Sequence, residues 1–575
     1  MKFSIPPYGG QLCDLLVGSD RSEQLKQISE GFPSVTLSQR QVCDLELLMN
    51  GAFSPLTGFM GQDAYNRCVE DMRLPSGELW PMPVTLDIPA AVAAGFEVGQ
   101  QIALRDGEGF MPAVLTIEDI WQPDKRLEAE KVYGTTSELH PGVRYLYDEV
   151  HDTYIGGRIE GIQGHGHFDF ENLWDTPEEL RNLFQKMGWR RVVGFQTSRP
   201  MHRMHRELTL RVAKDIQGHI LLHPAVGVTK PGDLHYYARV HCYQAIRRRF
   251  PHNLAILSLL PLAMRMAGPR EALWHTLIHQ NFGCSHFIVG PHHASPPQSE
   301  SVDSFYAAQS AQDLVAAHQQ DMAIQPVLVE EMKYQLQRKV FLPLSEFKGS
   351  EEAALEFTDN ELKECLTQNR EVPDWFSYPE VIHELRKVCP PRSQQGLTLF
   401  FTGLSGAGKS TIAKIVYAKM IESGGRPVTL LDGDVVRLNL SSELGFSKEH
   451  RNLNVRRIGF VASQITKNRG VAICAPIAPY AAMRAAARGD CEAHGAFIEV
   501  HVATPLDVCE SRDRKGLYAK ARKGLIPEFT GVSDPYEIPE APEIRIDTSD
   551  LSPMEAAEEV FLYLFQEGYL DLSDD

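Results

Sequence analysis

The run GLSGAGKST at residues 403–411 constrains the fold of this chain more than any other segment. It follows the β-branched and aromatic stretch TLFFT and precedes a helix-forming stretch. Glycines at 403, 406 and 408 let the backbone turn so that successive N–H groups face phosphate oxygens at a helix N-terminus. The pattern GxxxxGKS in this context predicts a P-loop, and with it a parallel α/β domain that handles nucleotide phosphates.

The residue types around this loop predict phosphoryl transfer from ATP with Mg²⁺ as cofactor. Lys409 supplies a charge for the β- and γ-phosphates, and the Ser410 hydroxyl is a metal ligand. A carboxylate at the end of a neighbouring strand is expected near the same ion, and LLDGD provides Asp432 and Asp434. The predicted ATP-binding loop comprises Gly403, Leu404, Ser405, Gly406, Ala407, Gly408, Lys409, Ser410 and Thr411.

Size, charge and cysteine usage narrow the class of protein. A chain of 575 residues predicts three or four domains. A net charge of −18 argues against nucleic acid as the main partner. Ten cysteines without a CxxC pair predict reduced thiols and no structural metal. The N-terminus lacks the pattern of an export signal, and no stretch approaches the ~18 apolar residues of a membrane span, so we expect a soluble, cytoplasmic protein.

Hydrophobic periodicity predicts an α/β multidomain fold. Short β-rich runs with turn signals predict a β-rich domain over 1–167. Helices and strands alternate over 168–330, which predicts a Rossmann-like parallel α/β domain. A polar helical connector and linker is expected over 331–392, ending near the two prolines of KVCPPRSQQG. The P-loop domain, a second doubly wound parallel sheet, is expected over 393–575.

Five ordered motifs make the last 180 or so residues similar to a known family. GLSGAGKST, LDGDVVR, LGFSKEHRNLNVRRIG, DRKGLYAKARKG and FTGVSDPYEIPEAPEI resemble adenylylsulfate kinase. That family transfers the ATP γ-phosphoryl group to the 3′-hydroxyl of adenosine 5′-phosphosulfate (APS), giving 3′-phospho-APS (PAPS) and ADP. The expected partners are therefore ATP and APS.

The resemblance implies roles for individual residues. Asp434 and Lys409 are the expected catalytic residues, and Arg512, directly before the lid-like DRKGLYAKARKG segment, is expected near the ATP adenine. Arginine suits the anionic groups of APS because its paired donors match planar oxyanions. The residues expected to bind APS are Arg437, Arg451, Asn454, Ile477, Lys515 and Phe529, with Lys515 near the phosphates and Phe529 stacked on the adenine.

One motif of that family is altered here. Where FISPYR is common, the chain reads PIAPYA over 476–481. Ala478 replaces a serine that some members phosphorylate, which excludes a phosphoserine intermediate but not direct transfer from ATP. Pro476 removes an aromatic residue that was expected to face Phe529 across the substrate adenine.

The first 390 or so residues resemble ATP sulfurylase, which makes APS from ATP and sulfate. The similar segments are LSQRQVCDLELLMNGAFSPLTGFM, VVGFQTSRPMHRMHRELTLRVA, NFGCSHFIVGPHHASP and VPDWFSYPEVIHELRK. Members of this family commonly form homo-oligomers, so the resemblance implies a symmetric assembly through this region.

The sulfurylase-like site departs from the family pattern at its centre. QTRNPMHRAH becomes QTSRPMHRMH, so Ser198 stands at the sulfate-binding arginine position and Arg199 one residue later. GRDHAGP becomes GPHHASP, which puts Pro291 at a phosphate-facing arginine position. Each missing charge costs ~2–4 kcal/mol of transition-state stabilisation. The degenerate site comprises Gln196, Ser198, Arg199, His202, His205, Pro291 and His293, and a zinc site at His286, His292 and His293 is not expected.

Three functions remain open from the sequence. The first, which we favour, is an APS kinase whose sulfurylase-like region is silent and serves assembly or regulation. The second is a bifunctional enzyme that makes PAPS from sulfate, with Arg199 and the histidines compensating. The third is a non-catalytic nucleotide sensor, against which the set Lys409, Ser410, Asp434, Arg437 and Arg451 argues.

Overall fold

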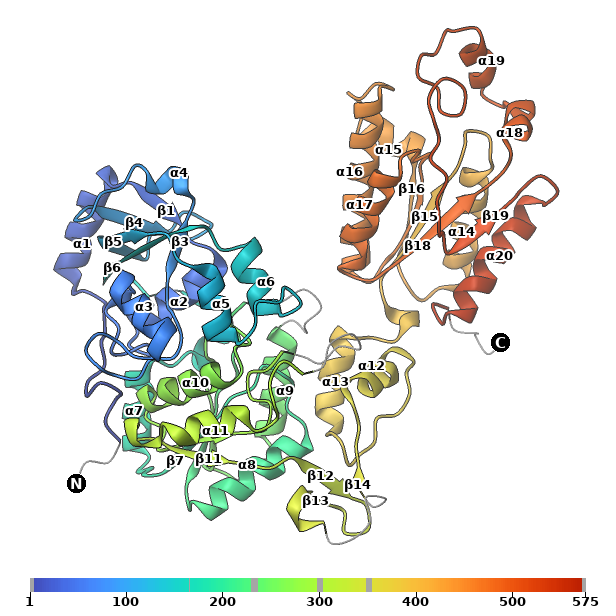
Figure 1. Ribbon diagram of the computed structural model, residues 1–575. Helices are drawn as coiled ribbons and strands as arrows, with labels where there is room; N and C mark the ends of the chain where they lie inside the picture. The colour runs from blue at the N-terminus through green and yellow to red at the C-terminus, as the bar shows by residue number, and fades with distance from the viewer. Residues whose placement is uncertain (1–4, 165, 229–235, 297–303, 348–353, 571–575) are drawn as a thin grey trace. The chain divides into compact units, whose positions relative to one another are not determined.

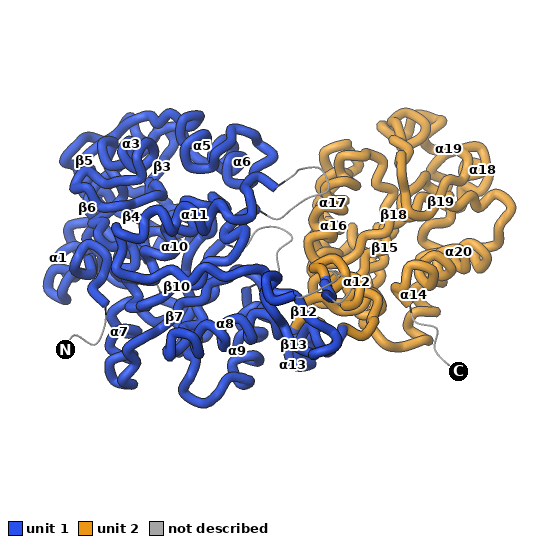
Figure 2. Tube along the Cα trace, turned by 60° about the horizontal axis from the view of Figure 1, so that its bottom comes forward, with its two compact units in different colours: residues 1–357, 373–384 blue, residues 358–372, 385–575 orange. Residues whose placement is uncertain are grey.

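The chain divides into two compact units in a computed structural model that describes residues 5–164, 166–228, 236–296, 304–347 and 354–570 (Figure 1). Unit 1 comprises residues 1–357 and 373–384, and unit 2 comprises residues 358–372 and 385–575 (Figure 2). The α/β fold class expected from the sequence is confirmed.

Unit 1 begins with a mixed six-stranded sheet. Its order is β1-β4-β5-β6-β2, with β3 also paired to β6, and only β1 and β4 run parallel. The predicted turn at DGEG joins the antiparallel strands β4 and β5. The strands are β1 Ser34–Thr36, β2 Gly58–Phe59, β3 Leu86–Ile88, β4 Gln101–Arg105, β5 Ala113–Trp121 and β6 Thr153–Gly161. The helices of this part are α1 Ser19–Ile28, α2 Gln39–Met49, α3 Gln62–Asp71, α4 Ala90–Ala93, α5 Lys125–Tyr133 and α6 Pro141–Asp148.

A parallel five-stranded sheet follows, in the order β11-β10-β7-β8-β9. The first strand lies at the centre and the chain winds outward in both directions, which is the topology of a doubly wound fold. The strands are β7 Val192–Phe195, β8 His219–Leu222, β9 Ala255–Leu257, β10 His286–Val289 and β11 Gln325–Leu328. The helices are α7 Pro177–Lys186, α8 Arg203–Asp215, α9 Tyr236–Arg247, α10 Pro269–Asn281 and α11 Ser310–Ala317.

Local chemistry explains where these helices begin. The Thr176 hydroxyl oxygen accepts a hydrogen bond from the Glu179 backbone N–H, and the Glu179 carboxylate accepts one from the Thr176 backbone N–H. This capping box, with Pro177 in the first turn, starts α7 where the TPEELRNLF pattern predicts a helix.

One hydrophobic core serves both parts of unit 1. Its buried members run from Tyr8 to Ile324 and include Phe53 and Trp274, whose ring centroids lie 4.9 Å apart. Residues on both sides of position 168 therefore stabilise each other. The two parts are packed as one unit.

The stretch expected to be a helical connector contains a small sheet before its helices. Strands β12 Met332–Gln335, β13 Val340–Pro343 and β14 Ala354–Leu355 form this antiparallel sheet, and Tyr334 stacks on Trp375. Helices α12 Asp359–Thr367 and α13 Pro379–Val388 follow. The stretch expected to be a helical connector thus contains helices α12 and α13 and, before them, alternating, aromatic-containing runs that pair as strands.

Unit 2 is built on a parallel sheet of order β16-β17-β15-β18-β19. Strand β15 is fully buried at the centre and leads straight into the P-loop. The strands are β15 Leu397–Thr402, β16 Val428–Asp432, β17 Val471–Ala475, β18 Ala496–Val502 and β19 Ile544–Ile546. The helices are α14 Lys409–Ser423, α15 Gly433–Asn439, α16 Lys448–Lys467, α17 Ala481–Glu492, α18 Leu506–Arg512, α19 Leu517–Arg522 and α20 Pro553–Gln566.

All ten cysteines are free thiols. Within the described residues, no helix has the length and apolar character needed to cross a membrane.

The buried ion pair between Asp44 and Arg265 generates a stability prediction. The Arg265 guanidinium donates to both Asp44 carboxylate oxygens at 2.6 Å, and both side chains are almost fully buried. D44A leaves the guanidinium uncompensated, so we expect it to lower the free energy of unfolding of unit 1 by about 3–5 kcal/mol. Urea denaturation of the full chain measures the change.

The matched control is D63A, which removes the exposed partner of Arg67. Because exposed pairs contribute ~0–1 kcal/mol, D63A should barely shift the transition. Equal effects of the two substitutions would contradict the importance of the buried pair.

Candidate active site

A cavity of about 610 Å³ lies at the carboxyl end of the unit 2 sheet. Ligands of open parallel sheets bind at this edge because the loops that follow the strands converge there. Fifteen of the residues predicted from the sequence line it: Ser405, Gly406, Gly408, Lys409, Ser410, Thr411, Asp432, Asp434, Arg437, Arg451, Asn454, Ile477, Arg512, Lys515 and Phe529. Gly403, Leu404 and Ala407 contribute backbone groups beside it instead.

The P-loop conformation requires glycine at two positions. Gly403 has φ +148° and Gly406 has φ +79°. An added Cβ would lie 2.5 Å from the Val502 carbonyl oxygen at Gly403 and 2.9 Å from that of Cys509 at Gly406. Any side chain would therefore push the loop away from α18 and β18.

Lys409 begins α14 and is only 7% exposed. Its ammonium donates to the carbonyl oxygens of Gly403 and Leu404 at 2.9 and 2.8 Å. Burial, aided by nearby Lys515, lowers the pKa of Lys409 to about 8. The charge is thus held over its own loop at the start of a helix whose free N–H groups attract anions.

The carboxylates are held by the turn after β16. Asp432 caps α15 by accepting from the Asp434 N–H at 3.0 Å. The Asp434 carboxylate is exposed and forms an ion pair with Lys515 of the segment predicted to be a lid. One hydroxyl at Ser410 and one or two carboxylates, completed by phosphate oxygens and water, form a donor set that suits Mg²⁺.

The arginines on the other side of the cavity are fixed by neighbouring groups. Arg451 donates to the Thr530 hydroxyl at 2.8 Å and lies 3.0 Å from the Asp534 carboxylate. Arg437 donates to the Gly445 carbonyl at 2.6 Å and lies over the ring of Phe446. Buried donor and acceptor atoms at Arg451 Nε and Asn454 Oδ1 have no protein partner in the described structure, as expected where a polar ligand completes the bonding.

Phe446, Tyr518 and Thr548 are among the lining residues that the sequence reasoning missed. Phe446 is 68% exposed and lines the cavity, as do Tyr518 and Thr548. Arg512 donates to both the hydroxyl and the carbonyl oxygen of Thr548, at 2.8 and 2.6 Å. The available signal was that Phe446 lies in the motif LGFSKEHRNLNVRRIG and Tyr518 in DRKGLYAKARKG.

The altered PIAPYA segment also lies at the cavity. Ala478 adopts φ +46°, and its carbonyl accepts from buried Arg484 at 2.8 Å. The Ile477 carbonyl accepts from the Thr402 hydroxyl at 2.7 Å. These bonds hold the backbone of the segment without the serine or the aromatic residue of the common motif.

In unit 1 the sulfurylase-like residues form two clusters. In the first, Gln196 lies 3.4 Å from the ring of His275, which is 3.0 Å from His293 and is also paired with Glu271. His275 and Glu271 are fully buried on α10 and were missed by the sequence reasoning. Pro291 begins the turn that carries His293.

The second cluster lies at the start of α8. His202 is buried, and its ring contacts the Ser377 hydroxyl at 2.9 Å and lies 4.4 Å from the ring of Phe376 at an angle of 33°. Its backbone N–H donates to His205 Nδ1. Ser198 offers its carbonyl oxygen to Arg239, and Arg199 is exposed.

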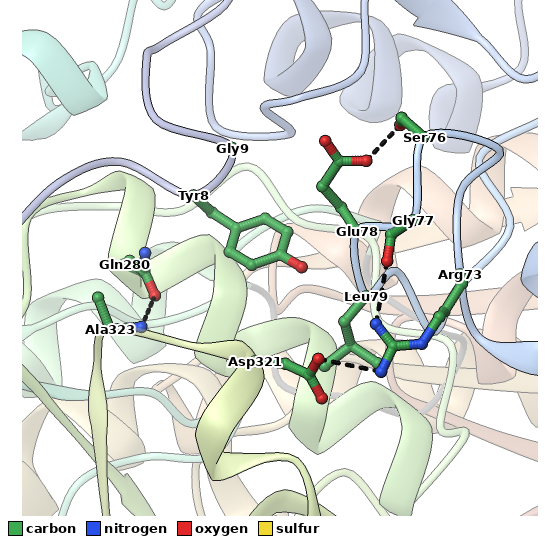
Figure 3. A pocket seen from close by; sticks show the side chains of 10 residues that line it. All are labelled: Tyr8, Gly9, Arg73, Ser76, Gly77, Glu78, Leu79, Gln280, Asp321 and Ala323. Atoms are coloured by element: carbon green, nitrogen blue, oxygen red, sulfur yellow. Dashed lines mark hydrogen bonds and ion pairs between the residues drawn. The ribbon is translucent and has the colours of Figure 1, made fainter.

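A second hollow, of about 510 Å³, lies in unit 1 beside Tyr8 and Leu79 (Figure 3). Its charged groups already satisfy one another, because Arg73 pairs with Asp321 at 3.0 Å and donates to the Gly77 carbonyl. Gln280 accepts from the Ala323 N–H at 3.0 Å. We therefore do not treat this hollow as the active site.

The sheet order, the P-loop and the lysine-lined cavity define unit 2 as a P-loop nucleotide-binding domain of the kinase class. Protein-family models agree with the division of the chain: "PUA-like domain" matches residues 5–164, "ATP-sulfurylase" matches 171–388 and "Adenylylsulphate kinase" matches 395–547. The chain therefore belongs to the ATP sulfurylase family, in the form that carries an adenylylsulfate kinase domain.

Relatives match over almost the whole chain. A sulfate adenylyltransferase of Phaeosphaeria nodorum is 46% identical over 98% of this chain and 99% of its own length. One of Aspergillus fumigatus is 46% identical over 99% of this chain and 100% of its own. A solved structure described as a hexameric APS kinase from Thiobacillus denitrificans has a TM-score of 0.81 and 39% identity, covering 99% of this chain and 100% of that one.

Buried neutral histidines in unit 1 predict that its stability depends on pH. Burial lowers the pKa of His202, His279 and His293 from 6.5 to about 3. The unfolded chain binds protons at these histidines more readily than the folded chain does. Their contribution to the free energy of unfolding is therefore complete above pH 6.5 and is lost as the pH falls from 6.5 towards 3. Each such group contributes a slope of up to about 1.4 kcal/mol per pH unit.

H202N should reduce this slope by up to about 1.4 kcal/mol per pH unit, because asparagine still suits the N-cap of α8 but does not titrate. Urea unfolding measured from pH 7 to pH 4 gives the slope. The control is H252N, at an exposed histidine, which should leave the slope unchanged. An unaltered slope in H202N would show that His202 is not buried in its neutral form.

Proposed function

We propose that unit 2 is an adenylylsulfate kinase that transfers the ATP γ-phosphoryl group to the 3′-hydroxyl of APS. The observation that carries this proposal is the convergence of buried Lys409, the two aspartates and two fixed arginines on one cavity at the end of a parallel sheet. The full-length relative described as an APS kinase supports it.

Lys409 and the P-loop N–H groups bind the β- and γ-phosphates. The ammonium exchanges its two loop carbonyl partners for phosphate oxygens, which also restore the charge that burial disfavours. Ser410 and Asp432 would hold Mg²⁺, which supplies charge neutralisation on the phosphates.

Arg437, Arg451 and Asn454 bind the anionic and polar groups of APS. Phe446 and Phe529 both line this side of the cavity and offer aromatic faces to an adenine. Phe446 thus takes the role of the second aromatic ring beside the adenine, which the family has at the position of Pro476.

Asp434 positions the acceptor hydroxyl. In the transfer, the bond between the 3′-oxygen and the γ-phosphorus forms as the bond to the β,γ-bridging oxygen breaks, and ADP leaves. The hydroxyl proton passes to the exposed Asp434 carboxylate or to solvent. The ion pair between Lys515 and Asp434 must break first, and the Lys515 ammonium can then contact the phosphates.

We propose a second function for unit 1, sulfate adenylyltransferase activity. The relatives that carry this name at about 46% identity favour it over a silent unit 1. Ser198 and Pro291 oppose it, because both stand where the family pattern has arginine. Together the two activities make PAPS from sulfate. We also propose a homo-oligomer, as described for the Thiobacillus relative.

K409A tests the kinase proposal. We expect APS-dependent ADP and PAPS formation by the wild-type chain, and a loss of about 100-fold or more in K409A, since one fixed charge supplies ~2.7–4 kcal/mol to such a transition state. A coupled assay for ADP together with chromatography of PAPS measures both. The control K414A removes an exposed lysine from the same helix and should retain activity. No APS-dependent ADP from the wild type would contradict the proposal and leave the nucleotide sensor.

The double substitution S198R/P291R tests unit 1. If unit 1 is active, the wild type forms ATP from APS and pyrophosphate, K409A retains that activity, and the double substitution changes it little. ATP formation that appears only after arginine is restored would instead show that the wild-type unit 1 is silent. A luciferase assay for ATP measures the reaction.

A further inference from the structure

Tyr518 is held rigidly in the lid-like segment. It lies in α19, is 1% exposed and lines the cavity. Its N–H and that of Ala519 donate to the Asp513 carboxylate at 3.1 and 3.0 Å. These bonds therefore hold the backbone that carries the Tyr518 side chain.

The hydroxyl of Tyr518 contacts the P-loop. It donates to the Ser405 carbonyl oxygen at 2.8 Å, and burial raises the pKa of Tyr518 so that the donor proton is retained. The Ser405 C=O and the Gly406 N–H belong to the same planar peptide unit and point in opposite directions. A hydrogen bond that fixes the carbonyl therefore also fixes the direction of the Gly406 N–H. This matters because Gly406, at φ +79°, is a conformationally permissive residue.

The ring of Tyr518 contacts Phe529. The two ring centroids lie 5.1 Å apart with an interplanar angle of 79°, an edge-to-face arrangement. The backbone of Phe529 is held as well, since its N–H donates to the Ser533 hydroxyl at 2.8 Å. Tyr518 thus restricts the ring of Phe529 at the side of the cavity assigned above to the APS adenine.

We propose that Tyr518 is a positioning residue that joins the two substrate subsites, with its hydroxyl aligning the P-loop for ATP and its ring aligning Phe529 for APS. The inference rests on the proposed kinase function.

Two substitutions separate the two contacts. Y518F keeps the ring and removes the hydroxyl, so we expect KM for ATP to rise about 3- to 10-fold while KM for APS stays within about twofold. Y518L removes both contacts, so KM for APS should rise by a similar factor as well. Steady-state kinetics of the full chain, with each substrate varied in turn, measures both constants.

The control Y563F makes the same chemical change at a half-buried tyrosine of α20 that packs on the same core but does not line the cavity. It should leave both constants unchanged. A merely structural role would lower thermal stability and kcat in Y518F without separating the two KM values, and that result would overturn the proposal. Unchanged KM for ATP in Y518F would overturn it too.

A binding measurement separates failure of this inference from failure of the kinase proposal. Titration calorimetry with a non-hydrolysable ATP analogue should show about 3- to 10-fold weaker binding to Y518F than to the wild type, whether or not the chain phosphorylates APS. Equal affinity would refute the P-loop contact. Weaker binding of the analogue to Y518F than to the wild type, together with no phosphorylation of APS by the wild type, would refute only the kinase proposal.

Discussion

Removing the Lys409 ammonium from water costs free energy, and the Gly403 and Leu404 carbonyls offset part of that cost at 2.9 and 2.8 Å. The arrangement depends on a buried central strand that delivers the loop, and on glycines that let it close tightly against β18 and α18. A polyphosphate suits a cation held in this way, because its oxygens would replace both carbonyls and would also supply the opposite charge. The other lining residues of the cavity lie around the Lys409 ammonium.

Side chains from other segments of unit 2 hold the backbone of the P-loop. Arg512 holds Thr548, whose hydroxyl in turn donates to the Ala407 carbonyl of the P-loop at 3.0 Å. Tyr518 holds Ser405 in the same loop. Tyr518 of the lid-like segment therefore bonds the phosphate-binding loop directly, and Arg512, which precedes that segment, is connected to the loop through Thr548. A movement of that segment would change the loop, and the ion pair of Lys515 with Asp434 would break in the same movement.

The parallel sheets and the P-loop site could be predicted because strand patterns and glycine spacing are local signals. TLFFT and VTLLD became β15 and β16 with Asp432 at the strand end. Contacts made by tertiary packing gave no such signal. His275 and Glu271 lie inside an all-buried helix, and the hydroxyl of Tyr518 finds its partner 113 residues away. The shared core of unit 1 was hidden for the same reason.

The most direct test of the account follows the γ-phosphoryl group itself. The full chain is mixed with ATP labelled at the γ-phosphorus and with APS, and a single turnover is separated by chromatography. The account predicts that the label appears at the 3′-position of PAPS and that K409A leaves it in ATP. Label released as inorganic phosphate would show hydrolysis in place of transfer, and would contradict the assignment of Asp434, Arg437 and Arg451 to an acceptor site.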